Sequence, residues 1–124
     1  MSSILLVDDD LDFRSMQRMA LERRGYAVGE ATDGRAALAQ LRQRKFDVVI
    51  MDIVMPEMEG IETIRCIREQ DPDLAIIAVS GGSPYTRADL NLLVARRMGA
   101  NHTLTKPFAQ DDLMTLIQET TTSS

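Results

Sequence analysis

The amino-acid sequence predicts an α/β protein whose five-stranded parallel sheet is covered by helices on both faces. Short β-type runs alternate with longer helical patterns five times along the 124 residues, and such alternation is typical of right-handed βαβ crossovers. Three of the runs, at 4–7, 47–51 and 74–79, are continuously apolar rather than alternating, apart from Asp47 at the start of the second. Continuous apolar runs indicate strands that are buried on both faces, so these three are expected in the middle of the sheet.

Each predicted strand is followed by a segment in which apolar residues have helical spacing. The strands are expected at 4–7, 26–31, 47–51 and 74–79, with a weaker pattern at 102–104. The first helix is expected to stop at Gly25 and the fourth at Gly99, because glycine suits the backbone conformation that often ends a helix. The third stops before Pro72, which cannot continue a helix. The apolar positions that share a helix face are, in chain order, Phe13, Met16 and Ala20; Ala37, Leu38 and Leu41; Ile61, Ile64 and Ile67; Leu90, Leu93, Val94 and Met98; and Leu113, Leu116 and Ile117.

The composition is that of one ordinary globular domain. Apolar residues make up 44 % and charged residues 27 % of the chain, and a chain of this length can bury one core. The net charge of −5 provides no basic face for a phosphate backbone, so direct nucleic-acid binding is not expected. The single Cys66 cannot form an internal disulfide. Neither a signal peptide nor a run of about 18 apolar residues is visible, so we expect no membrane span and a cytoplasmic location.

The domain is expected to cover residues 1–120. The last four residues, 121–124, belong to the polar stretch "TTTSS" and are expected to form a tail or the stub of a linker. The eight methionines are expected to fill space in the core, because the unbranched thioether adapts to irregular gaps.

Charged and polar residues gather where the predicted strands end. Asp8 and Asp9 follow the first strand, Asp52 the third, Ser80 the fourth and Lys106 the fifth. In an open parallel sheet these ends meet at one edge, where ligands bind. Carboxylates so close together repel one another unless a cation lies between them, and hard oxygen ligands without a nearby His or Cys suit Mg²⁺ better than zinc. The sequence therefore predicts a magnesium site that attracts phosphate oxygens at this edge.

Five short motifs at the strand termini carry a family resemblance. They are "VDDD" after the first strand, "MDIVMPEMEG" around Asp52, "VSGG" after the fourth strand, "GANH" before the fifth and "TKPF" after it. Together, and in this order, they resemble the receiver domain of two-component response regulators from one end of the chain to the other. The resemblance implies the flavodoxin-like (βα)5 fold, which is a doubly wound five-stranded parallel sheet with strand order 2-1-3-4-5 and helices on both faces.

The resemblance implies that Asp52 accepts a phosphoryl group from a phosphohistidine on a histidine kinase or a histidine phosphotransfer protein. Asp8, Asp9, Asp52 and the backbone carbonyl of Val54 would hold the Mg²⁺ that the reaction needs, with Asp9 the more direct ligand and Asp8 acting partly through water. Such a transfer needs mainly positioning and charge neutralisation. The protein would therefore be a signalling domain, not an enzyme beyond self-phosphotransfer and autodephosphorylation.

The same resemblance implies a switch. Lys106 would pair with a phosphate oxygen, the following Pro107 would have a cis peptide bond, and the Ser80 hydroxyl would move to bind the new phosphoryl group. That group carries roughly 1.5 to 2 negative charges, and the surface of the fourth helix, fifth strand and fifth helix would repack to regulate partner binding. No DNA-binding or catalytic segment follows the fifth helix, so a stand-alone receiver that binds a downstream protein is favoured over a fragment that lacks its effector domain. A homodimer that forms on phosphorylation stays an open alternative.

The sequence departs from the family pattern in three places. Thr103 stands where many relatives carry Tyr or Phe, which puts the usual inward swing of an aromatic ring in doubt. The segment between Ser80 and the fifth strand is longer than usual, and we hypothesise that its Tyr85 covers the phosphorylation site or the space left by Thr103. Val54 and Gly82 carry no polar side chain that could orient an attacking water, which predicts a long-lived phosphoaspartate.

Several residues near this edge have an ordinary structural explanation. Asp10 and Asp12 are expected to cap the start of the first helix, where carboxylates satisfy free N–H groups and the helix dipole. Gly60 is expected at a place that a Cβ would obstruct. Cys66 is expected to be an interior or half-buried thiol.

Three other classes of protein share some of these features. A phosphatase of the haloacid-dehalogenase type also uses an aspartyl phosphate, but it needs a carboxylate two residues after the nucleophile, where this chain has Val54. A flavodoxin-like FMN binder needs a first loop that receives phosphate, and "DDD" would repel one. A receiver fold that docks without being phosphorylated would not need the chemical positions, all of which are present.

Overall fold

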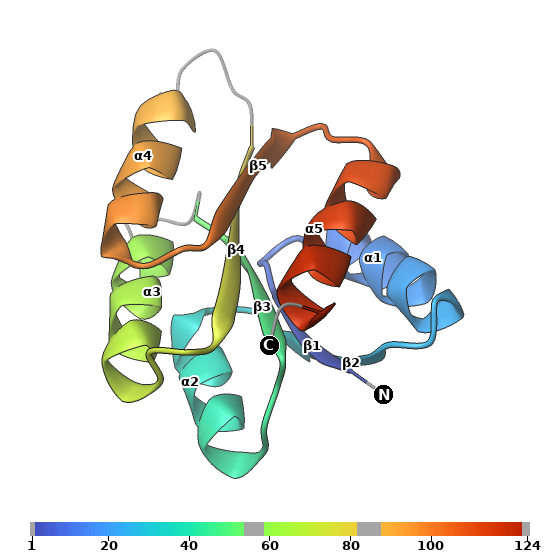
Figure 1. Cartoon of the computed structure of the whole chain (residues 1–124), viewed down its shortest axis with the longest axis horizontal. Helices are drawn as coiled ribbons and strands as arrows, with labels where there is room; N and C mark the ends of the chain where they lie inside the picture. The colour runs from blue at the N-terminus through green and yellow to red at the C-terminus, as the bar shows by residue number, and fades with distance from the viewer. Residues whose placement is uncertain (1, 54–58, 82–87, 123–124) are drawn as a thin grey trace.

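The computed structural model describes residues 2–53, 59–81 and 88–122, and in these residues strands and helices alternate five times. The elements shown in Figure 1 are β1 (Ser3–Val7), α1 (Leu11–Arg23), β2 (Ala27–Ala31), α2 (Gly34–Gln43), β3 (Val48–Asp52), α3 (Glu59–Gln70), β4 (Ala75–Gly81), α4 (Ala88–Met98), β5 (His102–Lys106) and α5 (Gln110–Thr122). All five predicted strands and all five predicted helices are present.

The strands form one parallel sheet in the order β2-β1-β3-β4-β5. The three strands with continuous apolar sequence, β1, β3 and β4, are its central members, as predicted. The chain moves outward from β1 to β2 and then returns to β3 on the other side of β1. The carboxyl ends of β1 and β3 therefore flank the point where the strand order reverses, which is where open α/β sheets bind ligands.

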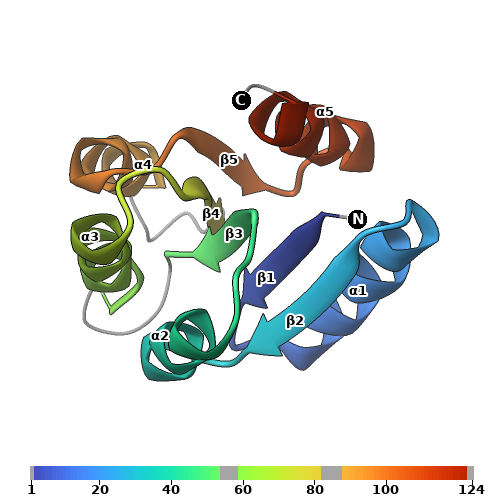
Figure 2. The ribbon, with the colours of Figure 1, turned by 60° about the horizontal axis from the view of Figure 1, so that its bottom comes forward.

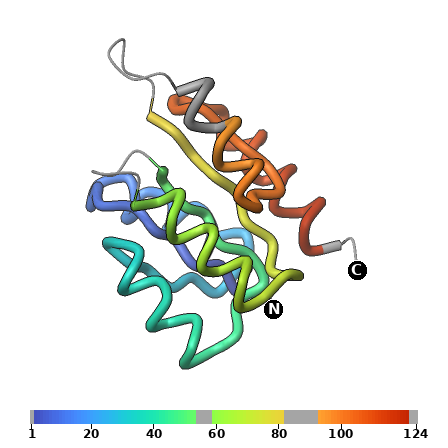
Figure 3. Tube along the Cα trace, turned by 90° about the vertical axis from the view of Figure 1, so that its left-hand side faces the viewer, coloured from blue at the N-terminus to red at the C-terminus, as the bar shows by residue number. Residues whose placement is uncertain are grey.

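Helices cover both faces of the sheet. In Figure 2, α1 and α5 lie on one face and α2, α3 and α4 on the other, and Figure 3 shows the second group side by side along its face. Because successive strand residues point to opposite faces, Leu5 and Val7 belong to the apolar core under α2, α3 and α4, whereas Ile4 and Leu6 belong to the core under α1 and α5. Burial on both faces explains why these strands have no polar alternation.

The buried face of α1 differs from the predicted one. The buried residues are Arg14, Gln17 and Leu21, whereas Met16, expected in the core, is 57 % exposed. The spacing of the buried residues is helical, but two of the three are polar, so a search for apolar periodicity misses them. Gln17 is accommodated because its side-chain amide and that of Gln110 on α5 each donate a hydrogen bond of 2.9 Å to the other.

The methionines fill the core only in part. Met51 and Met114 are buried, but Met16, Met19 and Met98 are exposed on helix surfaces. The expectation of a methionine-filled core is therefore wrong for these three. Cys66 is half-buried, as expected.

The predicted helix ends are confirmed at both glycines. Gly25 has φ of 94° and Gly99 has φ of 131°, in the region that side chains with a Cβ rarely adopt. At the start of α1, the Asp10 carboxylate accepts hydrogen bonds from the backbone N–H groups of Asp12 and Phe13, so Asp10 is the expected cap.

Helix α5 continues through Thr122 and so includes part of the stretch expected to be a tail. The boundary at residue 120 stays a prediction. Among the described helices, none combines the length and the apolar character that crossing a bilayer requires.

Candidate functional site

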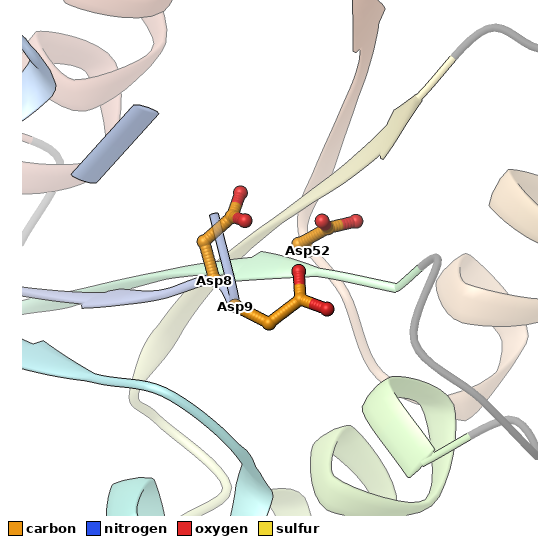
Figure 4. A group of neighbouring side chains, drawn as sticks. All are labelled: Asp8, Asp9 and Asp52. Carbon is orange, nitrogen blue, oxygen red and sulfur yellow. The ribbon is translucent and has the colours of Figure 1, made fainter. Parts of the chain in front are cut away.

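Three aspartates meet at the reversal point of the sheet. Asp8 follows β1, and Asp52 is the last residue of β3. Val7 pairs with Met51 in the parallel register. The residues that come next, Asp8 after β1 and Asp52 at the end of β3, therefore also lie beside each other. One carboxylate oxygen from each of Asp8, Asp9 and Asp52 lies within 4.8 Å of the other two, and Figure 4 shows the three side chains converging from the ends of the two strands.

The three carboxylates differ in their exposure to solvent. Asp8 is 2 % exposed and Asp52 is 7 % exposed, whereas Asp9 is exposed. A divalent cation held here would thus have buried oxygen ligands on one side and open access on the other. This set of hard oxygen donors fits Mg²⁺, which usually keeps several waters and binds through a few carboxylates.

Lys106 provides the positive charge that faces these carboxylates. It is the last residue of β5, and its ammonium Nζ lies 2.8 Å from Asp8 Oδ2 and 3.7 Å from Asp52 Oδ2. β4 separates β5 from β3, and β3 separates β4 from β1, so the long lysine side chain reaches across two strands. The sequence prediction that Asp8, Asp52 and Lys106 share one pocket is confirmed.

Asp8 is held by hydrogen bonds to both its side chain and its backbone. Its side-chain Oδ1 accepts a hydrogen bond of 2.9 Å from the N–H of Asp10, and its backbone carbonyl accepts one of 2.6 Å from Nη1 of Arg14. The Arg14 Nε also donates to Glu30 on β2 at 3.1 Å. Arg14 therefore fixes the turn that carries the first two acids, a role that the sequence did not suggest.

Glu30 belongs to an ion-pair cluster beside this turn. Arg18 donates a hydrogen bond to the Glu30 carboxylate, and this contact, together with a second from Arg14, lowers the pKa of Glu30 below its ordinary value despite partial burial. The same contact raises the pKa of Arg18. The cluster joins α1 to β2 next to the acid pocket.

Ser80 lies on the neighbouring strand β4, one residue beyond the position that pairs with Asp52. Asp52 pairs with Val79 on β4, so the following residue, Ser80, lies at the same edge. It is completely buried, and among the described residues its hydroxyl Oγ has no hydrogen-bond partner. A buried hydroxyl without a partner costs about 1–3 kcal/mol, so this group would gain from a new acceptor in the pocket.

Gly60 lets the start of α3 approach the acid pocket. A Cβ at this position would lie 2.7 Å from the backbone oxygen of Asp52 and 2.7 Å from the Cα of Ile53. Only glycine fits without moving the end of β3, which explains the glycine that closes "MPEMEG". The Lys106–Pro107 peptide bond is cis, as expected.

A sequence model of the response regulator receiver domain matches residues 4–118. The chain belongs to this family. This assignment favours the receiver over the phosphatase and FMN-binder alternatives, and the acidic pocket has the composition expected of a receiver's phosphorylation site.

Two bacterial proteins illustrate how closely this receiver domain resembles its relatives. It is 39 % identical over 119 residues to the response regulator receiver protein CpdR of Brucella abortus, covering 96 % of each chain. It is also 39 % identical over 106 residues to the chemotaxis protein CheY of Thermotoga maritima, covering 85 % of each chain. Both relatives match this chain over most of their own length.

Solved structures have the same fold. The CheY-like receiver protein of Methanospirillum hungatei superposes with a TM-score of 0.85 at 29 % identity, over 96 % of this chain and 92 % of that one. The response regulator TrrA of Thermotoga maritima, described as a complex with Mg²⁺-BeF, superposes with a TM-score of 0.80 at 30 % identity, over 97 % and 99 % of the two chains. The flavodoxin-like fold predicted for the receiver is thus confirmed.

Not every predicted site residue can be placed. Val54 and Tyr85 lie outside the described residues, so the carbonyl ligand and the covering loop stay predictions. Thr103 is half-buried on β5, paired with Ala78 of β4, and its role in the switch is also still a prediction.

Proposed function

We propose that this receiver domain accepts a phosphoryl group on Asp52 from a histidine kinase or a histidine phosphotransfer protein, in a reaction that requires Mg²⁺. One observation carries the proposal: three carboxylates, one ammonium group and one buried hydroxyl, which has no hydrogen-bond partner in residues 2–53, 59–81 and 88–122, meet at a single edge of the sheet. A phosphoryl group supplies the negative oxygens that the ammonium and the hydroxyl can bind.

Asp8, Asp9, Asp52 and the backbone carbonyl of Val54 would hold the metal. When bound, Mg²⁺ offsets the repulsion among the carboxylates and neutralises charge on the phosphoryl oxygens. The hydrogen bond from the Asp10 N–H and the contact with Lys106 keep the Asp8 carboxylate in place. The turn is thus organised before a phosphodonor arrives.

In the transfer step, a carboxylate oxygen of Asp52 attacks the phosphorus of the phosphohistidine in line with the P–N bond. A new O–P bond forms as the P–N bond breaks, and the electron pair stays on the imidazole nitrogen, which is then protonated by solvent. Lys106 faces the forming acyl phosphate with its positive charge. Positioning and charge neutralisation supply most of the catalysis in such transfers.

The phosphorylated site would then change the surface around β4 and β5. The Ser80 hydroxyl gains an acceptor in the phosphoryl oxygens, and its movement, together with that of Lys106, would carry the ends of both strands with it. A downstream protein or a separate effector domain that binds the changed surface of α4, β5 and α5 would shift the population further. Thr103 lies on that surface, so the switch would work there without an aromatic ring. A cytoplasmic location and a homodimer that forms on phosphorylation stay predictions.

The relatives support this proposal. The TrrA structure is described as a complex with Mg²⁺-BeF, and we propose that the acid pocket of this chain takes the same two ligands.

Intact-mass measurement after incubation with Mg²⁺ and a small phosphodonor such as acetyl phosphate tests the proposal. The wild-type chain is expected to gain the mass of one phosphoryl group, and Asp52→Asn to gain none. Asp10→Asn is the matched control, because Asp10 is next to the cluster in sequence but caps α1, and asparagine caps equally well. Equal phosphorylation of wild type and Asp52→Asn would refute the assignment of Asp52.

A further inference from the structure

The Lys106 ammonium has a third neighbour besides Asp8 and Asp52. Its Nζ lies 3.8 Å from the centroid of the Phe13 ring on α1. At this distance the negative face of an aromatic ring attracts a cation. The ammonium is therefore held between carboxylates on one side and an aromatic face on another.

The Phe13 ring is itself fixed. The backbone N–H of Phe13 donates a hydrogen bond of 3.3 Å to the Asp10 carboxylate that caps α1. The Phe13 ring meets the Phe108 ring edge to face, with 6.2 Å between centroids and 84° between planes. Such a geometry is the favoured one for a pair of aromatic rings. Two constraints from different parts of the chain thus place the ring beside the lysine.

Open space adjoins this arrangement. A cavity of about 560 Å³ is lined by Phe13, Met16, Gly81, Lys106 and Phe108 among others. A lysine side chain has four flexible carbons and a strongly hydrated charge, so the cavity gives the ammonium room to leave the acid pocket. The attraction of the ring opposes that movement.

We propose that Phe13 is a positioning residue that holds the Lys106 ammonium beside Asp52 through its aromatic face, so that the lysine is in place when a phosphoryl group arrives. The proposal rests on the function proposed above, and it adds a contact from α1 to the phosphorylation site. Lys106 touches the phosphoryl group, and Phe13 acts through Lys106.

Beryllofluoride binding in saturating Mg²⁺ measures the effect without a protein donor, whose own contacts with α1 could confuse the result. An attraction of this kind is worth about 0.5–2 kcal/mol, so its loss in Phe13→Leu is expected to weaken beryllofluoride binding roughly two- to thirtyfold. Phe13→Tyr retains an aromatic face and is expected to bind as the wild type does. Binding of Mg²⁺ alone, which depends on the three aspartates, is expected to stay within about twofold.

Fluorinated phenylalanines at position 13 separate attraction from packing. Adding one, two and three fluorines makes the ring face progressively less negative while its shape changes little, so the affinity for beryllofluoride is expected to fall step by step. The matched control is the same series at Phe46, whose ring also carries a cation, with Arg44 Cζ 4.5 Å from its centroid. Phe46 precedes β3 at the opposite end of the sheet, so fluorination there is expected to leave the affinity unchanged.

The NMR chemical shifts of the Lys106 side-chain protons provide an independent test of the proposal. Methylene protons above an aromatic face are shifted upfield, and this shift is expected in the wild type and in Asp52→Asn but not in Phe13→Leu. Its absence from the wild type would overturn the proposal.

The outcomes separate this inference from the function on which it rests. If the wild type fails to bind beryllofluoride, or Asp52→Asn binds it equally well, the phosphorylation site itself is wrong. If the wild type binds but affinity is flat across the fluorinated series, Phe13 contributes only packing and the inference alone is wrong. If Phe13→Leu loses Mg²⁺ binding because its fold is disturbed, the fluorinated series, which keeps the ring, still decides whether Phe13 acts through attraction or through packing.

Discussion

Replacing Lys106 with methionine should destabilise the protein in the absence of Mg²⁺, and Mg²⁺ should restore most of the loss. Methionine keeps an unbranched side chain but removes the charge. It leaves Asp8, which is 2 % exposed, without the ammonium 2.8 Å from its Oδ2. Removing one partner of a buried pair costs about 3–5 kcal/mol. Because Lys106 is 22 % exposed and Asp8 keeps its hydrogen bond from Asp10, we expect about 2–3 kcal/mol here.

This free energy converts into a measurable melting shift. A chain of 124 residues has an unfolding entropy near 0.26 kcal/mol/K, taking about 2.1 cal/mol/K per residue, so the expected fall in Tm is about 8–12 °C. Mg²⁺ at one hundred times its Kd adds about 2.7 kcal/mol of stability, which is about 10 °C on the same scale. The variant should bind Mg²⁺ more tightly than the wild type, because no ammonium competes for Asp8.

Thermal unfolding followed by circular dichroism, with EDTA or with a Mg²⁺ titration, measures both effects. Lys45→Met is the matched control, because Lys45 is the other lysine of the chain and is exposed, and its Tm is expected to stay within about 2 °C of the wild type. Two results would refute the reasoning: a Lys106→Met variant as stable as the wild type in EDTA, or an equal Mg²⁺ shift in wild type and Asp9→Asn.

Three further predictions concern the surroundings of the pocket. Gly60→Ala places a Cβ 2.7 Å from the backbone oxygen of Asp52, so it should destabilise the fold by about 1–3 kcal/mol in urea unfolding and slow phosphorylation by acetyl phosphate; normal rates would show that the end of β3 can shift freely. Glu30 has a lowered pKa in the folded state, so its contribution to stability is present above the ordinary value of 4.5 and is lost as the pH falls through the folded value. Glu30→Gln should thus be less stable than the wild type by about 1 kcal/mol at pH 7, with a gap that closes in acid; a constant gap would contradict the ion-pair explanation. Since Val54 and Gly82 carry no polar side chain, the phosphoryl mass should persist longer in the wild type than in Val54→Asn, and rapid loss from the wild type in Mg²⁺ would count against that interpretation.

The residues at the carboxyl edge of the sheet could be predicted because the sequence signal for each of them lies within a few neighbouring positions. Continuous apolar runs mark central strands, and the residue that follows each run falls at the carboxyl end of a parallel sheet. Some strands end later in the structure than the sequence predicts. Asp52 and Lys106 are therefore the last residues of β3 and β5, and not residues that follow these strands. The error does not matter for the site, since the side chains still converge. The strand order itself came from the family resemblance.

Contacts between distant residues could not be predicted in the same way. Gln17 and Gln110 are 93 positions apart, and their amides satisfy each other only because α1 and α5 pack side by side. Arg14 is buried because the Asp8 carbonyl and Glu30 accept its hydrogen bonds. A polar residue on a buried face has no signature of its own in the sequence, because its partner must be known before its burial makes sense. The same reasoning explains why Phe13 was predicted as core and proved to lie against a lysine.

We expect the charge and the hydrogen bonding of the pocket to couple phosphorylation of Asp52 to Lys106 and Ser80 in separate ways. With three carboxylates and one ammonium the pocket is about two charges negative, a deficit that one divalent cation can offset. Transfer of a phosphoryl group to Asp52 adds up to about one further negative charge, and this renewed excess attracts Lys106 more strongly. In the part of the chain that the structure describes, the buried Ser80 hydroxyl has no hydrogen-bond partner. A buried hydroxyl without a partner costs about 1–3 kcal/mol, and we expect new phosphoryl oxygens to offset this cost. Coupling between sites in proteins is typically about 1–3 kcal/mol, so we propose that a new hydrogen bond to Ser80 is enough to couple phosphorylation to β4 and β5 without an aromatic ring at position 103.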